Sequence, residues 1–229
     1  MTDHESTRGV RRTRRSRPGR TKILIADDHP IVRQGFKQVL SDTPDMVVAD
    51  EAGNGQEVLS LVSKKDYDVI LLDISMPGKN GLEVLKELKV VSPKTPVLIL
   101  SIYPEEQYAI RALKAGASGY LTKASAPEEL ISAIRKVSRG GKYVSSSLAE
   151  KIAYQLDGDS EKAPHETLSD REYQILLMIA SGKTVSDIAG EMCLSVKTVS
   201  TYRSRIIDKM KMKNNAELTT YAIRNKLVE

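Results

Sequence analysis

The stretch Val69-Ile70-Leu71-Leu72-Asp73, continued by Ile74-Ser75-Met76-Pro77-Gly78, decides the fold of this chain. A short, continuous apolar run that ends on an acid and is followed by a Pro-Gly turn indicates a strand buried on both faces. Such strands form parallel sheets that are covered by helices on either side. In these folds ligands bind outside the carboxyl ends of the strands, which is where the acid at the end of this run lies.

Four further apolar runs alternate with segments of helical period. The predicted strands are Lys22–Ala26, Met46–Ala52, Asp68–Asp73, Pro96–Ser101 and Gly119–Thr122. The predicted helices are Ile31–Ser41, Gly55–Lys65, Gly81–Val90, Glu105–Ala115 and Pro127–Ser138. Alternation of this kind predicts an α/β domain with a doubly wound, five-stranded parallel sheet over residues 21–141.

The rest of the chain divides into an extension, a linker and a second domain. Residues 1–20 are rich in Arg and lack apolar periodicity, so we expect a disordered extension. Residues 142–165 are expected to form a linker with one short helix, which Ser145–Ser147 cap. Residues 166–229 show no strand signal and predict four helices, the first opened by a capping box of Ser169 and Glu172. The two short connections that follow suit a helix-turn-helix.

Length and composition exclude several classes of protein. At 229 residues two domains are the default, and no apolar run approaches the ~18 residues of a membrane span. The single cysteine, Cys193, cannot form an internal disulfide, and no secretory signal precedes the first strand. We therefore expect a cytoplasmic protein that does not contact membranes, with Cys193 as a small buried apolar residue.

The net charge of +5 is unevenly distributed. The extension at 1–20 carries seven Arg against two acids, so the remaining chain is neutral. This extension is either a solvated tail or an arm that contacts DNA. A second basic patch lies at 195–213, with six basic residues against one acid.

Three carboxylates are expected to meet at one edge of the sheet. Asp27 and Asp28 follow the first predicted strand, and Asp73 ends the third. Carboxylates this close repel one another and need a hard cation, for which Mg²⁺ is suited because it binds carboxylates together with phosphate oxygens. The arrangement favours phosphoryl transfer to an aspartate. Ser101 and Lys123 end the fourth and fifth strands on the same side, where they can hold phosphoryl oxygens.

The acidic pair, the Asp73 loop, Ser101, Tyr120 and Lys123 together resemble the motifs of response-regulator receiver domains, which are flavodoxin-like. The resemblance covers about 120 residues. It implies that Asp73 accepts the phosphoryl group and binds Mg²⁺ together with Asp27, Asp28 and the backbone carbonyl of Ser75. It also implies that Ser101 and Lys123 bind the phosphoryl group and that Tyr120 is the switch aromatic. The sequence departs from many receivers in one position, where Ala124 replaces the proline that commonly follows the lysine.

Other interpretations of the acidic residues are less well supported. A nucleotide hydrolase is expected to carry a Gly-x-x-x-x-Gly-Lys-Ser/Thr loop, which is missing from the sequence. A phosphatase with an aspartyl-phosphate intermediate usually has a second Asp two residues after the nucleophile, where this chain has Ser75. We assign His29 to packing or capping outside the site.

The basic patch predicts a DNA-reading helix. Val199, Ile206 and Met210 share one apolar face, and the opposite face is small and polar, as in helices that enter the major groove. The residues expected to contact bases or phosphates are Lys197, Thr198, Ser200, Thr201, Tyr202, Arg203, Ser204, Arg205 and Lys209. The stretches Leu168–Glu172 and Thr184–Ala189 resemble the first helices of LuxR-type DNA-binding domains.

A receiver followed by a LuxR-type domain resembles the NarL/FixJ class of response regulators. This resemblance implies a transcriptional regulator, not an enzyme, with a sensor histidine kinase and promoter DNA as partners. It also implies a homodimer in the phosphorylated or DNA-bound state, for which Leu218, Tyr221 and Ala222 in the last helix, 216–225, are the candidates. The hypothesis is that phosphorylation draws Ser101 and Lys123 inward and that Tyr120 rotates into the vacated space.

Two rival functions stay open at this point. One is an aspartyl-phosphate phosphatase with an accessory domain, and the other is a constitutive DNA-binding protein with a degenerate receiver.

Overall fold

The structure is a computed structural model that describes residues 19–157 and 163–228. The first domain alternates strands and helices. Its elements are β1 (Thr21–Ala26), α1 (Pro30–Ser41), β2 (Met46–Ala52), α2 (Gly55–Val62), β3 (Val69–Asp73), α3 (Gly81–Val91), β4 (Val97–Ser101), α4 (Glu105–Lys114), β5 (Gly119–Thr122) and α5 (Pro127–Ser138). The predicted extension falls almost entirely on residues 1–18, which lie outside the described part of the chain.

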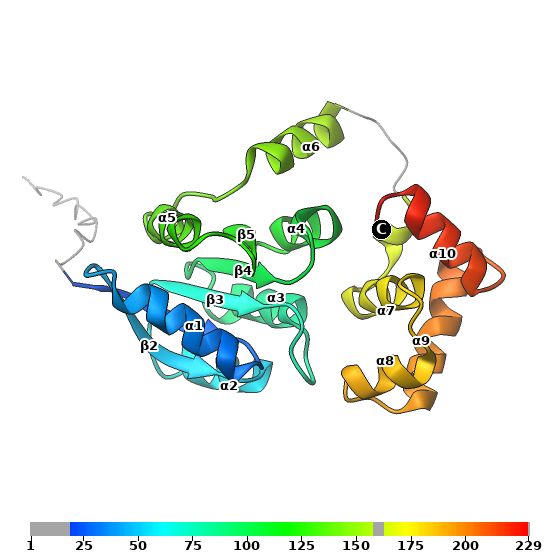
Figure 1. Ribbon diagram of the computed structural model, residues 1–229, viewed down its shortest axis with the longest axis horizontal. Helices are drawn as coiled ribbons and strands as arrows, with labels where there is room; N and C mark the ends of the chain where they lie inside the picture. The colour runs from blue at the N-terminus through cyan, green and yellow to red at the C-terminus, as the bar shows by residue number, and fades with distance from the viewer. Residues whose placement is uncertain (1–18, 158–162, 229) are drawn as a thin grey trace, which may run out of the picture.

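All five strands run parallel in the order β2-β1-β3-β4-β5 (Figure 1). The predicted α/β fold with a doubly wound parallel sheet is therefore confirmed. The strand order reverses between β1 and β3, and a crevice forms at such a reversal, outside the carboxyl ends of the strands. The acids that follow β1 and end β3 thus meet at the switch point of the sheet.

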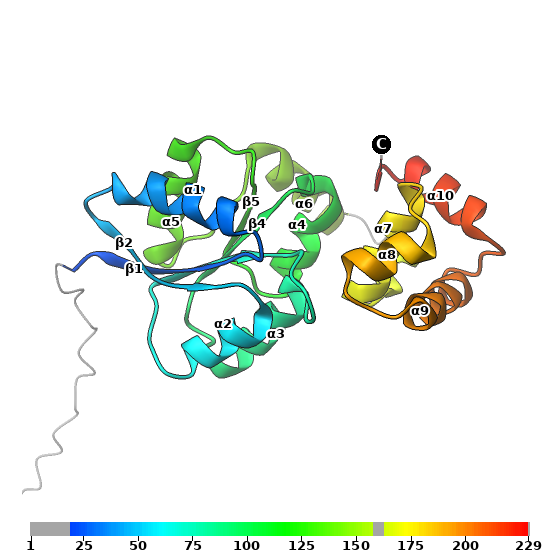
Figure 2. The ribbon, with the colours of Figure 1, turned by 60° about the horizontal axis from the view of Figure 1, so that its bottom comes forward.

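Alternating side chains of the strands build two apolar layers. Leu24 and Leu72 belong to the cluster that packs under α2, α3 and α4, whereas Ile23 and Leu71 belong to the cluster that packs under α1 and α5. Figure 2 shows α1 and α5 on one face of the sheet and α2 and α3 on the other. Burial on both faces explains why β3 is a continuous apolar run without alternation.

The second part of the chain is helical. It comprises α6 (Ser146–Asp157), the 3₁₀ turn η1 (Pro164–Thr167), α7 (Asp170–Ala180), α8 (Val185–Glu191), α9 (Val196–Lys209) and α10 (Asn215–Arg224). The predicted capping box at the start of α7 forms, because the Ser169 hydroxyl accepts from the Glu172 amide and the Glu172 carboxylate accepts from the Ser169 amide. Helices α8, α9 and α10 pack with α7 as a bundle.

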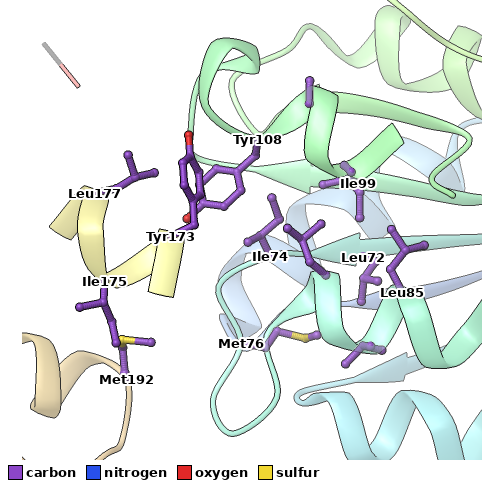
Figure 3. Packing of buried hydrophobic residues seen from close by; sticks show 14 of the residues in the cluster. Leu72, Ile74, Met76, Leu85, Ile99, Tyr108, Tyr173, Ile175, Leu177 and Met192 are labelled. Carbon is purple, nitrogen blue, oxygen red and sulfur yellow. The ribbon is translucent and has the colours of Figure 1, made fainter. Parts of the chain in front are cut away.

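Helix α7 belongs to the second domain and faces the first, and all eleven of its residues are buried. One side of α7 packs against α9 and α10, and the other side meets α4 and the loop between β3 and α3. Figure 3 shows Tyr173 of α7 beside Tyr108 of α4 at this junction, where one continuous apolar cluster runs from the sheet into the bundle.

The expectation that Cys193 is buried is wrong. It is exposed and not buried, and it adopts a φ of 52° in the turn between α8 and α9. Its amide donates to the Gly190 carbonyl to close the turn, and the backbone conformation required for this closure leaves the side chain in solvent.

Candidate functional site

Three carboxylates and one imidazole gather at the carboxyl edge of β1 and β3. One ligand atom from each of Asp27, Asp28, His29 and Asp73 lies within 4.8 Å of the others. Asp27 and Asp73 are only 2% and 1% exposed. The side chains are brought together because β1 and β3 are hydrogen-bonded neighbours that end at the same edge.

Lys123 supplies the nearest cation. Its ammonium lies 2.7 Å from Asp27 Oδ2 and 2.9 Å from Asp73 Oδ2, and its amide donates to the Ser101 carbonyl at the end of β4. Burial raises the pKa of Asp73, and Asp27 adds to this effect while Lys123 opposes it. Burial acts to lower the pKa of Lys123, but the charges of Asp73 and Asp27 outweigh it and raise that pKa. The single positive charge of Lys123 therefore does not neutralise the three negative charges of Asp27, Asp28 and Asp73.

The cluster has the donors that a divalent cation requires. Among the described residues, the buried carboxylate oxygen Asp73 Oδ1 has no hydrogen-bond partner. Buried charged oxygens without donors are costly unless a cation binds them. Hard oxygen ligands of this kind fit Mg²⁺.

His29 lies in the cluster, contrary to its assignment from the sequence. Its Nδ1 is 2.8 Å from Asp28 Oδ1 and 3.2 Å from Asp27 Oδ1. His29 precedes α1, but its ring makes no capping hydrogen bond to that helix. The short spacing to the acidic pair was the signal that should have placed it in the site.

Ser101 and Tyr120 are buried beside the cluster. The Ser101 hydroxyl accepts from the Tyr103 amide at 3.1 Å, and the Tyr120 hydroxyl donates to the Tyr103 carbonyl at 2.7 Å. Tyr120 is 0% exposed, so the expectation that it must rotate inward does not hold for this conformation. Its hydrogen bond to the β4–α4 loop already holds it in the interior.

Glycine permits a close approach that the sequence analysis missed. A Cβ on Gly81 would lie 2.0 Å from the carbonyl oxygen of Asp73. The Gly81 amide donates to the Ile74 carbonyl at 2.8 Å, so the start of α3 packs directly on the acidic loop. In the same loop Gly78 adopts a φ of 75°, a conformation that other residues rarely adopt. Both glycines therefore shape the loop that presents Asp73.

Arg111 of α4 is the centre of the contact between the domains. Its guanidinium donates to the carbonyls of Leu168 and His165, at 3.0 Å and 2.5 Å, and lies 4.1 Å from the ring centroid of Tyr173. Asp170 lies 3.4 Å from the same guanidinium and 2.5 Å from the Lys86 ammonium. These polar contacts border an open cavity of about 720 Å³. The interface is thus polar and incompletely packed.

A chain of aromatic rings links the loop between β4 and α4 to α7. Tyr103 and Tyr108 have ring centroids 5.0 Å apart, and Tyr108 meets Tyr173 edge-on at 5.4 Å. The Tyr173 hydroxyl donates to the Gln107 carbonyl at 2.8 Å. Arg171, the second residue of α7, donates to the Gly78 carbonyl in the loop that follows Asp73. Helix α7 therefore touches both segments that adjoin the carboxylate cluster.

Helix α9 keeps its polar face open to solvent. Its predicted apolar face is confirmed, since Val199, Ile206 and Met210 are buried. The exposed residues of the predicted reading face are Lys197, Ser200, Thr201, Ser204 and Arg205. Thr198, Tyr202 and Arg203 are half-buried.

Two basic residues of α9 are engaged within the domain. The Lys209 ammonium lies 2.7 Å from the buried Glu172 carboxylate, and its side chain is 42% exposed, so it forms an ion pair within the domain and its predicted phosphate contact stays a prediction. Arg203 Nε donates to Asn215 Oδ1 at 2.6 Å, which fixes one edge of its guanidinium against the start of α10.

The dimer candidates on α10 require a correction as well. Leu218 and Ala222 are 0% exposed because they pack on α7, so they offer no surface to a second subunit. The Tyr221 hydroxyl lies 2.8 Å from His165 Nδ1 within the same chain. The outer side of α10 instead exposes Thr220 and Ile223.

The helices of the described residues include none with the length and apolar character of a membrane span.

Comparisons with known families divide the chain in two. Residues 23–135 match the response regulator receiver domain, and residues 166–222 match the bacterial regulatory proteins of the luxR family.

Two curated relatives align with this chain over nearly their whole length. Response regulator GacA of Pseudomonas aeruginosa is 37% identical over 91% of this chain and 98% of its own length. The oxygen regulatory protein NreC of Staphylococcus carnosus is 38% identical over 91% and 99%.

Solved structures of RcsB from Salmonella enterica serovar Typhimurium are similar in fold. RcsB bound to promoter rprA in the presence of the phosphomimetic BeF₃⁻ is 27% identical, with a TM-score of 0.62 over 89% of this chain and 98% of that chain. A structure of two RcsB dimers bound to two parallel DNAs is 25% identical, with a TM-score of 0.56 over 92% and 100%. The motifs, the sheet with its acidic edge, the helix-turn-helix and these relatives agree, and the chain belongs to the NarL/FixJ class of response regulators, DNA-binding transcriptional regulators of two-component systems.

Proposed function

We propose that Asp73 accepts a phosphoryl group from a sensor histidine kinase and that this event controls the binding of promoter DNA by α9. The observation that carries the proposal is the position of Asp73, which lies buried between the acidic pair and Lys123 at the switch point of the sheet. We expect both events to take place in the cytoplasm, with residues 21–141 acting as the receiver and 166–229 as the DNA-binding domain.

The reaction is a transfer between two nucleophiles. A carboxylate oxygen of Asp73 forms a bond to phosphorus while the phosphorus–nitrogen bond of a phosphohistidine breaks, and the histidine nitrogen leaves with the electron pair. Lys123 and Ser101 are positioned to hold the equatorial phosphoryl oxygens. The three aspartates and the Ser75 carbonyl would hold Mg²⁺, which would supply positive charge to offset the charge that develops on these oxygens.

Coupling to the DNA-binding domain follows the contacts of α7. Movement of Ser101 toward a phosphoryl group changes its hydrogen bond with Tyr103, and the rings of Tyr108 and Tyr173 transmit the displacement to α7. The Tyr108 hydroxyl is buried without a hydrogen-bond partner among the described residues, so this part of the contact is not held by a polar bond. The proposed switch requires that the contacts of α7 have two arrangements.

DNA binding is assigned to the open face of α9, with Lys197, Ser200 and Thr201 toward base edges and Arg205 toward a phosphate. RcsB, a relative in fold, is described as a dimer on DNA, and a symmetric pair of reading helices fits a two-fold operator. We therefore propose a homodimer of the phosphorylated or DNA-bound chain that uses the outer side of α10, including Thr220 and Ile223, in place of its buried residues.

The test compares wild type with Asp73→Asn in Mg²⁺ and acetyl phosphate. Wild type is expected to incorporate one phosphoryl group per chain and to bind its promoter more tightly, and the variant to do neither. Full stimulation of the variant would refute the switch. Rapid, repeated turnover of phosphoesters would favour a phosphatase, and tight binding that ignores the phosphodonor would favour a constitutive DNA-binding protein.

A further inference from the structure

Arg33 of α1 reaches beneath the acidic turn without belonging to the carboxylate cluster. Its Nη1 donates to the backbone carbonyl of Asp27 at 2.6 Å, and its Nε donates to Glu51 Oε2 at 3.2 Å. The side chain is 19% exposed. One planar guanidinium therefore ties the end of β1 to a carboxylate on β2.

The contacts fix Asp27 from several directions. Its amide donates to the Ala52 carbonyl at 3.1 Å, and its Oδ1 accepts from the His29 amide at 2.9 Å. The Arg33 contact satisfies the remaining backbone group of Asp27. The Asp27 amide and carbonyl are thus both held, which fixes the peptides on either side of Asp27 and the backbone from which the Asp27 and Asp28 side chains project.

Glu51 is a firm anchor for Arg33. The Lys37 ammonium lies 2.6 Å from Glu51 Oε1 and leaves Oε2 to Arg33. The hydrogen bond from Lys37 lowers the pKa of Glu51, burial opposes it, and Arg33 lowers it further. The anchor is therefore an ionised carboxylate held by two cations.

We infer that Arg33 is a positioning residue for the divalent-cation site, and that it sets the affinity for Mg²⁺ by orienting Asp27 and Asp28. The inference rests on the proposed function, because it concerns the same carboxylate site. The direction in which Mg²⁺ affinity changes when Arg33 is replaced shows whether Arg33 acts by orienting the carboxylates or only by its charge. A cation near the site repels Mg²⁺, so loss of its charge alone would tighten binding, whereas loss of orientation weakens it.

The experiment measures Mg²⁺ affinity on the full chain without phosphodonor, from the rise of melting temperature with Mg²⁺ concentration. Arg33→Gln is expected to weaken the affinity roughly 10-fold, the lower end of what is found when partners of metal ligands are removed. Lys37→Gln is the matched control, because it removes a cation from the same helix and the same anchor but leaves the Asp27 carbonyl bonded. Its affinity is expected to stay within about twofold of wild type, since exposed charges are screened.

A second readout separates positioning from a general loss of structure. At saturating Mg²⁺, Arg33→Gln is expected to be phosphorylated by phosphoramidate at close to the wild-type rate, so that only the Mg²⁺ dependence shifts. Arg33→Lys, which keeps the charge but loses the planar fork that joins the Asp27 carbonyl to Glu51, is expected to weaken Mg²⁺ binding in the same direction and by less. This variant tests the role of Arg33 even if Arg33→Gln fails to fold.

The outcomes distinguish two failures. If Mg²⁺ left the melting temperature of wild type unchanged, the metal site and the role of Arg33 would both be wrong. If wild type responded and Arg33→Gln bound Mg²⁺ equally or more tightly, the site would stand and the positioning role would be overturned. Equal weakening by Lys37→Gln would overturn it as well.

Discussion

Replacement of Arg111 by alanine is expected to weaken the contact between the two domains. Arg111 donates from a charged group to two carbonyls, and each such bond contributes about 1.5–3 kcal/mol. The stacking on Tyr173 adds about 1 kcal/mol, but contributions that share one group do not add fully. We therefore expect Arg111→Ala to reduce the free energy of docking by about 2–4 kcal/mol.

The reduced docking free energy should be measured through the unfolding of the DNA-binding domain, because docking stabilises that domain against unfolding. Cys193 is the only cysteine of the chain and is exposed, so a thiol-reactive fluorophore on it reports on this domain in the full chain. With a urea slope of about 1–2 kcal/mol per molar for a small domain, the urea concentration at the unfolding midpoint is expected to fall by about 1–4 M.

Lys114→Ala provides the matched control on the same helix. Lys114 is 62% exposed, and its ammonium lies 3.6 Å from Glu166 across the same interface. An exposed pair of this kind contributes less than about 1 kcal/mol. If Arg111→Ala and Lys114→Ala lowered the urea midpoint equally, the reasoning about the interface would be refuted.

Four further outcomes concern individual charged or titratable side chains. Because burial raises the pKa of Asp73, its ionised form costs stability as pH rises through the raised pKa, and Asp73→Asn without Mg²⁺ should melt higher than wild type at pH 7 but not at pH 4. Arg205→Ala should weaken DNA binding and should reduce by about one the slope of the logarithm of the binding constant against the logarithm of salt concentration. Lys209→Ala should lower the stability of the DNA-binding domain, because it leaves the Glu172 carboxylate buried without its partner. Burial, together with nearby cations, lowers the pKa of His165, so the stability of the docked domain should fall as pH drops below about 6.5. In urea titrations His165→Asn should remove this pH dependence. If the pH dependence persisted in the variant, His165 would not be its source.

The sequence predicted the sheet and its acidic edge because both depend on local patterns. Apolar runs of strand length define β1 and β3, and an acid at the end of such a run must lie at the carboxyl edge. Strand order was not visible in any single run, and it came with the resemblance to receivers. The contacts of His29 were missed because a histidine before a helix is usually explained by local packing.

The contact between the domains was not predictable from periodicity. Arg171 and Gln174 are polar residues of α7, and a helix with one apolar face predicts that its polar residues lie in solvent. Here the receiver covers them, so α7 is buried on both sides. A pattern of apolar residues identifies a face that is buried within a domain, but it cannot identify a polar face that a second domain covers.

The ion pair of Lys209 on α9 and the burial of two dimer candidates on α10 were missed for a different reason. Lys209 forms a pair with Glu172, which is 37 residues away, and charge counting along a helix cannot show such a partner. Leu218 and Ala222 are apolar, which is equally expected of a core position and of a dimer contact. Only their complete burial against α7 decides between the two.

While α7 is docked, the reading face of α9 remains in solvent, with Lys197 and Arg205 exposed. Attraction to DNA phosphates does not depend on sequence and supports sliding along the duplex. On the proposed assignment of α9, we therefore expect the unphosphorylated chain to associate with DNA already, without regard to sequence. The delay before a promoter responds would then be set by the arrival of the phosphoryl group and by pairing of two chains, and not by a search that begins in free solution.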